Sequence, residues 1–204
     1  MTRLMKNNAI GVCAIALMTI AAAPAGASDA YKVSSGEVTV MCPLTVGGSF
    51  EAKTKNLSGD VTPASDEQGA ARGALKVELQ TLETGISVRD RHMKNNYLEV
   101  EKGPEFSTAM LEDIRVEKLE GKTVFSAMLS LHGQKKKVTG AAELQEKDGK
   151  VRVQAQFPVK VSEFEIPAPT YLGVGVRDEI QIKVSLLAVR TSGEAATGTS
   201  GQKR

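Results

Sequence analysis

The fold of this chain is decided by its most regular stretch, which reads Val151-Arg152-Val153-Gln154-Ala155-Gln156-Phe157-Pro158-Val159-Lys160-Val161. Apolar residues recur at every second position, which is the period of a β-strand that has one face in an apolar interior and the other in water. An amphipathic helix would instead carry apolar residues three and four positions apart. The stretch therefore predicts a strand of an antiparallel sheet, because such a sheet can bury one face and expose the other.

The same alternation recurs along most of the chain. The apolar faces of the other predicted strands are Leu75, Val77 and Leu79; Phe106, Thr108, Met110, Ile114 and Val116; Phe125, Ala127, Leu129 and Leu131; and Ile180, Ile182, Val184 and Leu186. Turn residues such as Lys147-Asp148-Gly149-Lys150 separate the runs. One polar segment, residues 85–98, predicts a short helix with Ser87 as its N-cap and Asp90 in its first turn. We therefore expect an all-β protein, an antiparallel barrel of about eight strands with one short helix.

The N-terminus has the pattern of a secretory signal peptide. Arg3 and Lys6 precede an apolar run over residues 9–23, and Ala25-Gly26-Ala27 provides a small-residue cleavage site. The run is about 15 residues long, shorter than the roughly 20 that a spanning helix needs, so a cleaved signal is favoured over an uncleaved anchor. We predict a signal peptide at residues 1–27, a domain at 28–190 with no membrane segment, and a disordered tail at 191–204.

Charge and cysteine content argue against a nucleic-acid-binding protein and against a protein stabilised by an internal disulfide. The chain has 26 Lys and Arg against 24 Asp and Glu, and loss of Arg3 and Lys6 with the signal leaves 24 of each. Because binding to phosphate backbones needs a basic surface, nucleic-acid binding is not expected. Cys13 also lies in the signal, so Cys42 is the only cysteine of the mature chain and no internal disulfide can form. We expect Cys42 to be buried and inert; a reactive thiol is the alternative.

Candidate catalytic and metal-ligating residues are few. The only histidines are His92 and His132, no Cys-x-x-Cys or His-x-x-x-His spacing occurs, and no Gly-x-Ser-x-Gly motif is present. We therefore predict no metal, no cofactor and no enzymatic activity. Arg89, Asp90 and His92 form the one dense polar cluster. We expect it to be a structural group at the rim of the barrel, the alternative being a general base at His92 oriented by Asp90.

Several motifs, taken in order, resemble the YceI-like family of exported lipid-binding proteins. They are Arg89-Asp90-Arg91-His92-Met93, Tyr97-Leu98-Glu99-Val100, Pro104-Glu105-Phe106-Ser107, the segment from Leu129 to Val138, Phe164-Glu165-Ile166-Pro167, Tyr171-Leu172-Gly173-Val174 and Asp178-Glu179-Ile180. The resemblance extends from about Tyr31 to Val189. It implies an extended, lipocalin-like antiparallel barrel with an apolar tunnel that holds polyisoprenoid or other long-chain lipids. It also implies a periplasmic location and no catalytic role.

With this resemblance, the alternating residues become candidates for the wall of a binding cavity. The predicted ligand-binding residues are Leu75, Val77, Leu79, Phe106, Met110, Phe125, Leu129, Val153, Phe157, Ile182 and Val184. The expected ligand is a long-chain lipid of isoprenoid, quinone or fatty-acyl type, carried or stored in the periplasm. The low aromatic content, 4% with no Trp, favours aliphatic walls suited to a flexible chain.

Two other functions fit the same residues. The apolar faces would equally fill a closed core, in which case the protein would be a structural or stress-response protein acting through its surface. An enzyme built on Arg89, Asp90 and His92 is the less favoured alternative. The sequence allows either a monomer or a homodimer.

Overall fold

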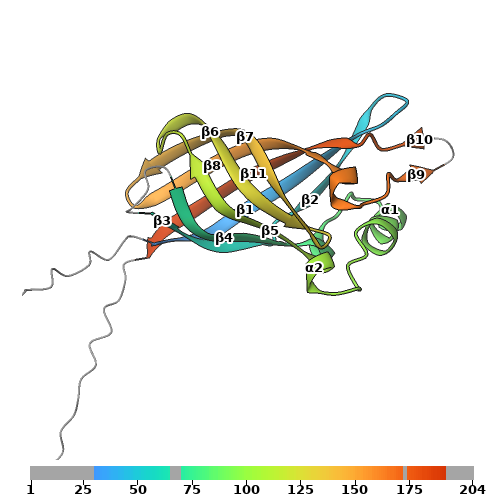
Figure 1. Ribbon diagram of the computed structural model, residues 1–204, viewed down its shortest axis with the longest axis horizontal. Coiled ribbons are helices and arrows are strands. Elements are labelled where there is room, and N and C mark those ends of the chain that lie inside the picture. Colours follow the sequence, from blue (N-terminus) through green and yellow to red (C-terminus); the bar gives the residue numbers. More distant parts are fainter. Residues whose placement is uncertain (1–29, 65–69, 172–173, 192–204) are drawn as a thin grey trace, which may run out of the picture.

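The computed structural model describes residues 30–64, 70–171 and 174–191, and the strands among them form a closed barrel (Figure 1). The predicted signal peptide at residues 1–27 lies outside the described residues, as does all of the predicted tail except Thr191. The strands are β1 (Ala30–Pro43), β2 (Ser49–Thr54), β3 (Leu57–Pro63), β4 (Ala70–Glu78), β5 (Thr108–Val116), β6 (Gly121–Leu131), β7 (Gln134–Lys147), β8 (Lys150–Lys160), β9 (Thr170–Tyr171), β10 (Val174–Gly175) and β11 (Glu179–Thr191). The helical segments are two 3₁₀ turns, η1 (Leu79–Thr81) and η3 (Val161–Phe164), two α-helices, α1 (Ser87–His92) and α2 (Pro104–Ser107), and a π-helical turn, η2 (Met93–Tyr97).

The barrel closes where its first strand pairs with its last. Antiparallel pairing between β1 and β11 runs from Ala30↔Thr191 to Met41↔Gln181. Around the wall the order is β1-β3-β4-β5-β6-β7-β8-β11, every pair being antiparallel. β2 and β3 share one edge of β1, since β2 pairs with its C-terminal half and β3 with its N-terminal end. The predicted antiparallel barrel of about eight strands is thereby confirmed.

The tightest hairpins follow from residues that accept a left-handed backbone. Between β7 and β8, Asp148 has φ 52° and Gly149 has φ 69°; between β6 and β7, His132 has φ 51° and Gly133 has φ 73°. Two successive positive φ values define a turn whose twist matches that of the flanking strands, and Asp-Gly is among its preferred sequences. These turns set the register of three consecutive strands, which fixes the face of the wall to which each side chain points.

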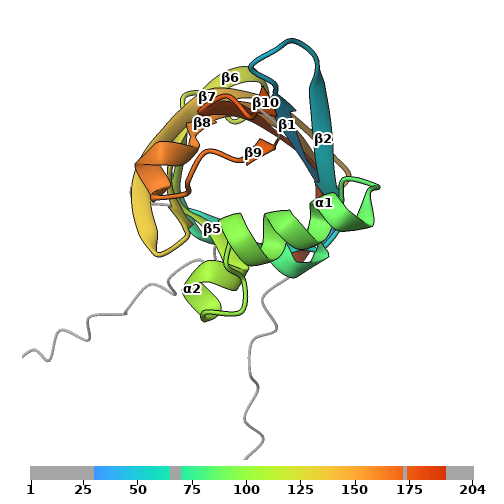
Figure 2. The same cartoon turned by 90° about the vertical axis from the view of Figure 1, so that its right-hand side faces the viewer.

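Helical segments border one end of the barrel (Figures 1 and 2). α1 and η2 continue into one another along one side of the opening, and β9 and β10 lie on its other side. The short helix expected within residues 85–98 is present, but its N-cap is Ile86 rather than Ser87, and no side chain caps it. Asp90 instead accepts hydrogen bonds from Thr84, which anchors the helix to the segment before it. No helix among the described residues is long and apolar enough to cross a membrane.

The strand that was expected to begin at Phe106 begins at Thr108. Pro104 occupies the first position of α2, where its missing N–H costs nothing, and Phe106 belongs to this helical turn. Its ring packs edge-on against His132, with 4.8 Å between ring centroids. The alternation of Phe106 with Thr108 and Met110 was therefore misleading, since a helical turn and a strand meet between them.

Two clusters of buried residues occupy the interior. The larger contains Phe125, Phe157 and Phe164 together with aliphatic residues of β6, β7, β8 and β11. The smaller consists of Val38, Leu57, Leu186 and Ala188, with partly buried neighbours such as Tyr31 and Val33. Because Ala30 pairs with Thr191 at the end of the β1–β11 ladder, the smaller cluster lies toward the end of the barrel away from α1.

Candidate functional site

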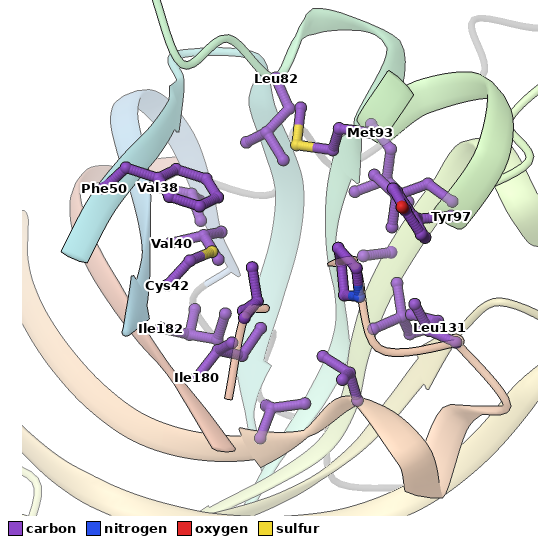
Figure 3. Close-up of a pocket in the computed structure, with 18 of the residues that line it drawn as sticks. Val38, Val40, Cys42, Phe50, Leu82, Met93, Tyr97, Leu131, Ile180 and Ile182 are labelled. Atoms are coloured by element: carbon purple, nitrogen blue, oxygen red, sulfur yellow. The ribbon is translucent and has the colours of Figure 1, made fainter. Parts of the chain in front are cut away.

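An apolar cavity of about 870 Å³ lies inside the barrel, and residues of α1 and η2 contribute to its lining. This volume is near the upper end of the roughly 300–1,000 Å³ typical of small-molecule pockets. Figure 3 shows Phe50, Val40 and Cys42 on one side of the space and Tyr97 and Leu131 on the other. The wall is mostly aliphatic, so the cavity offers dispersion contacts and water exclusion rather than hydrogen bonds.

Eight of the eleven predicted wall residues line this cavity. They are Leu75, Val77, Leu79, Met110, Leu129, Phe157, Ile182 and Val184. They come from β4, η1, β5, β6, β8 and β11, so strands distant in sequence contribute to one surface. Whether each contacts a ligand stays a prediction.

The other three predicted residues, Phe106, Phe125 and Val153, lie elsewhere. Phe106 packs on His132 from α2. Phe125 is buried behind Phe157, with the two rings edge-to-face at 5.6 Å. Val153 packs against the smaller buried cluster, beyond the cavity. Phe125 and Val153 point inward, as the alternation predicts, but at levels of the barrel where the interior is filled.

Phe157 lines the cavity with Phe125 packed behind it, and a glycine makes their packing possible. A Cβ built on Gly140 would lie 2.6 Å from Phe157 Cβ and 2.9 Å from Phe125 Cε1, and 2.3 Å from the backbone oxygen of Gln156. Such distances leave no room for a side chain at position 140. This part of the cavity wall therefore rests on an aromatic pair that β7 accommodates by carrying glycine at position 140.

Sequence reasoning missed the contribution of β1. Val38, Val40 and Cys42 line the cavity, followed by Leu44 just beyond the strand. Their period-two spacing is visible in the sequence and would have identified them. Leu82 and Tyr97 also line the cavity, but they lie in irregular or helical segments where no periodic signal marks them.

Of the predicted rim cluster, two residues reach the cavity and one does not. Arg89 and His92 line it, both from α1. Asp90 Oδ1 accepts hydrogen bonds from the backbone N–H and the hydroxyl of Thr84, at 2.7 and 2.6 Å. Asp90 therefore anchors the start of α1 to the preceding segment; the role of the cluster as a whole stays a prediction.

Arg89 is held over the ring of Phe50, with 4.4 Å between the guanidinium carbon and the ring centroid. This cation–π contact joins α1 to β2. We call this end of the cavity, next to α1, its mouth. Isolated bridges also tie this end together: Lys53 of β2 pairs with Glu83, and Leu44 pairs with Val176. The mouth is therefore bounded by segments bonded to the barrel wall.

Cys42 lies in the cavity wall as a buried thiol. Burial raises its pKa to about 11, a shift that the nearby positive charge of Arg89 partly opposes. Since the thiolate is the reactive species, Cys42 is protonated and unreactive at neutral pH. Among the described residues, no group of three or more His, Cys, Asp and Glu is placed to hold a metal ion.

His132 is a buried histidine that connects the β6–β7 hairpin to η3. Its Nδ1 donates to the carbonyl oxygen of Phe164 at 3.0 Å. Its Nε2 lies 3.3 Å from Glu99 Oε2 and has no hydrogen-bond partner among the described residues. β7 and β8 pair only from Ala141↔Gln156 to Lys147↔Lys150, so η3 packs against β7 beyond the end of this ladder. His132 therefore helps hold η3 in the wall at the cavity end.

The structure defines the class of this protein: a closed antiparallel β-barrel with helices at one end and an apolar cavity inside. The YceI-like domain model matches residues 29–188, and the chain belongs to that family. No curated protein sequence matches the chain significantly.

Two solved structures share the fold. Burkholderia cenocepacia BcnA has a TM-score of 0.63 at 16% identity, covering 76% of this chain and 96% of its own. A polyisoprenoid-binding domain from Saccharophagus degradans, implicated in plant cell wall breakdown, has a TM-score of 0.61 at 16% identity, covering 79% of this chain and 98% of its own. At this level of identity the similarity establishes the architecture alone.

Proposed function

We propose that this protein is a non-catalytic binding protein that encloses a long-chain lipid of isoprenoid, quinone or fatty-acyl type. The observation that carries the proposal is the apolar cavity of about 870 Å³ inside a closed barrel. An interior this size, lined from β1, β4, β5, β6, β8 and β11, is not the packed core that a purely structural protein would have. The polyisoprenoid-binding description of one structural neighbour supports the same ligand class.

The composition of the wall fits a flexible chain better than a flat ring system. Phe50, Tyr97 and Phe157 are its only aromatic residues among those described, and the rest of the apolar lining is aliphatic. Transfer of each methylene from water into such a site contributes about 0.8 kcal/mol. Eight enclosed methylenes would therefore contribute about 6 kcal/mol before the cost of ordering the chain.

We further propose that the protein works in the periplasm, where it carries or stores this lipid. The signal-like sequence of residues 1–27 and membership of the YceI-like family support export. A long-chain lipid is insoluble in the aqueous space between two membranes, and an enclosing barrel would remove its apolar surface from water.

Recovery of the ligand is the direct test of this function. Protein isolated from its native host under non-denaturing conditions is expected to carry extra mass in native mass spectrometry, and solvent extraction should release a long-chain lipid. Protein that is uniformly free of lipid and cannot be loaded with one would overturn the proposal. A stoichiometric protein partner recovered from such lipid-free protein would favour the surface-acting alternative.

A pair of neighbouring substitutions on β11 tests whether the lipid binds in the cavity. Val184 lines the cavity, whereas Ser185 is exposed on the outer face. Val184→Glu is expected to abolish lipid loading, because a carboxylate would be buried against the chain. Ser185→Glu should load normally. Val184→Thr keeps the side-chain shape and replaces one methyl group by a hydroxyl. It should fold normally and load lipid more weakly, so a folding defect in the Glu variant leaves the test intact.

A further inference from the structure

The basic residues that line the cavity lie next to one another on α1. Among the described lining residues, Arg89 is the only one with a permanent charge, and none is Asp or Glu. His92 lies one helical turn further along α1, on the same helix face, and also lines the cavity. The only groups in this wall that carry or can acquire a positive charge are therefore neighbours at its mouth.

The guanidinium of Arg89 is positioned but not neutralised. Its carbon lies 4.4 Å from the centroid of the Phe50 ring. A guanidinium that stacks on an aromatic face keeps its N–H donors at its edge, where they can still form hydrogen bonds. No described carboxylate forms an ion pair with Arg89, and the carboxylate next to it in sequence, Asp90, is bound to Thr84.

The surroundings of Arg89 favour binding of an anion from the cavity side. The side chain is only partly exposed, and its field reaches Cys42 in the wall, where it opposes the effect of burial on the thiol. Ile86 and Val88, just before it, are cavity-lining residues that are 49% and 59% exposed. Because Arg89 is itself partly buried, a charged pair that it forms is less screened by water than one on an open surface.

We propose that Arg89, assisted by His92, is a head-group site for an anionic amphiphile whose chain occupies the cavity. The ligand class is a single-chain lipid with a terminal carboxylate or phosphate, oriented with its head at α1 and its tail toward Phe157. The planar guanidinium suits bidentate contact with either oxyanion. This inference rests on the proposed lipid binding and adds the charge and direction of the ligand.

The test compares lipids that share one chain and differ in the head. Delipidated protein is equilibrated at about pH 8, where a carboxylate is ionised, with hexadecanoate, hexadecyl phosphate or hexadecanol below the concentrations at which they aggregate. The expected result is that one or both anions bind about tenfold or more tightly than the alcohol, since a hydrogen bond to a charged group has that strength. The two anions separate a carboxylate site from a phosphate site.

Three variants assign the preference to Arg89. Arg89→Gln should reduce anion binding to the level of the alcohol while leaving alcohol binding unchanged. Arg89→Lys should restore part of the preference, because a point charge replaces the bidentate donor. Arg91→Gln removes an equal charge from an exposed residue of α1 that does not line the cavity, and should keep the preference.

The outcomes separate this inference from the proposed function. Equal binding of anions and alcohol by the unmodified protein, or a preference that survives Arg89→Gln, would overturn the head-group site while lipid binding stands. Failure of all three lipids to bind would overturn the proposed function together with it. Loss of alcohol binding in Arg89→Gln would show that Arg89 shapes the mouth instead, and would also contradict the inference.

Discussion

Ile182 and Leu186 point into the same barrel from the same strand, yet their surroundings differ. Ile182 is partly exposed and lines the cavity, whereas Leu186 is 6% exposed and packs with Val38, Leu57 and Ala188. β6 divides in the same way, since Leu129 and Leu131 line the cavity while Phe125 and Ala127 do not. The barrel interior therefore has an open half near α1 and a filled half away from it.

Glycines at inward positions explain part of this difference. Gly36 pairs with Leu186, and a Cβ at position 36 would lie 2.6 Å from Leu57 Cδ2 and 3.2 Å from Leu186 Cβ. Leu57 and Leu186 occupy the space that a side chain on β1 would take. Gly140 does the same for the Phe125–Phe157 pair. Absent side chains on two strands thus let large neighbours meet where the filled half borders the cavity, which Leu57 and Phe157 also line.

The largest expected effect contrasts truncation in the two halves. Leu186→Ala should lower the free energy of unfolding by about 2–5 kcal/mol, because it removes contacts and leaves a void in a filled region. Ile182→Ala should cost clearly less, since its side chain already borders open space. Urea denaturation of delipidated protein measures both. Equal losses would mean that the two halves are packed alike.

Enlarging a side chain should lower stability in the filled half and lower lipid loading in the open half. Ala127→Phe, at a site 3% exposed in the filled half, should destabilise the protein by about 1–3 kcal/mol through overpacking. Val40→Phe, in the open half, should leave stability nearly unchanged because the added ring enters the cavity. The same Val40→Phe protein should load less lipid. Unimpaired loading combined with strong destabilisation would contradict the placement of Val40 beside open space.

The anchoring of α1 and η2, which together we call the helical cover of the barrel end, predicts a smaller and more local effect. Asp90→Ala removes the acceptor of both hydrogen bonds from Thr84 and should cost about 1 kcal/mol. Because none of the residues of α1 and η2 is buried, the loss should appear as faster amide exchange across residues 84–97 rather than in the filled half. Arg91→Ala, on the same helix without such a contact, is the control. Uniformly faster exchange would show that the cover is not a separate unit.

The smallest effect concerns Cys42 and depends on pH. With a pKa of about 11 in the folded protein, about one thiol in a thousand is ionised at pH 8, so alkylation by iodoacetamide should be slow and should accelerate toward pH 11. Folding raises this pKa from 9.0, so the stability tied to the neutral thiol is complete below pH 9 and declines between pH 9 and 11.

Cys13→Ser leaves Cys42 as the only thiol for this measurement. Unfolding in urea should restore an ordinary alkylation rate, and loading with lipid should slow it further. Rapid labelling of folded protein at pH 8 would contradict burial of this part of the wall.

The sequence predicted which residues face the barrel interior better than it predicted where that interior is open or filled. Alternation placed Val153, Phe157, Ile182 and Val184 on the inner face correctly, because the side-chain period of a strand is a local property. Whether an inward residue meets open space or a neighbour depends on the residues of other strands, as the glycine paired with Leu186 at position 36 shows. That information is spread over strands distant in sequence.

The helical segments were the less predictable part of the site. Residues 85–98 were recognised as a helix, but the placement of Arg89 over Phe50 depends on how that helix crosses the barrel end. Phe106 was assigned to a strand because its spacing continued the alternation past Pro104. Tyr97 and Leu82 line the cavity from segments without any period. Local sequence patterns carry no record of such tertiary placement.

The pairing of β1 with β11 also governs the order in which the molecule can form. The ladder joins the first described strand to the last, so β1 has no partner on that side until residues 179–191 have been made. Until then β1 and β8 each present an unpaired edge, which is the feature that lets strands of separate chains associate. Contacts so distant in sequence also slow folding. A chain truncated before Glu179 would therefore be an aggregation-prone open sheet rather than a smaller barrel.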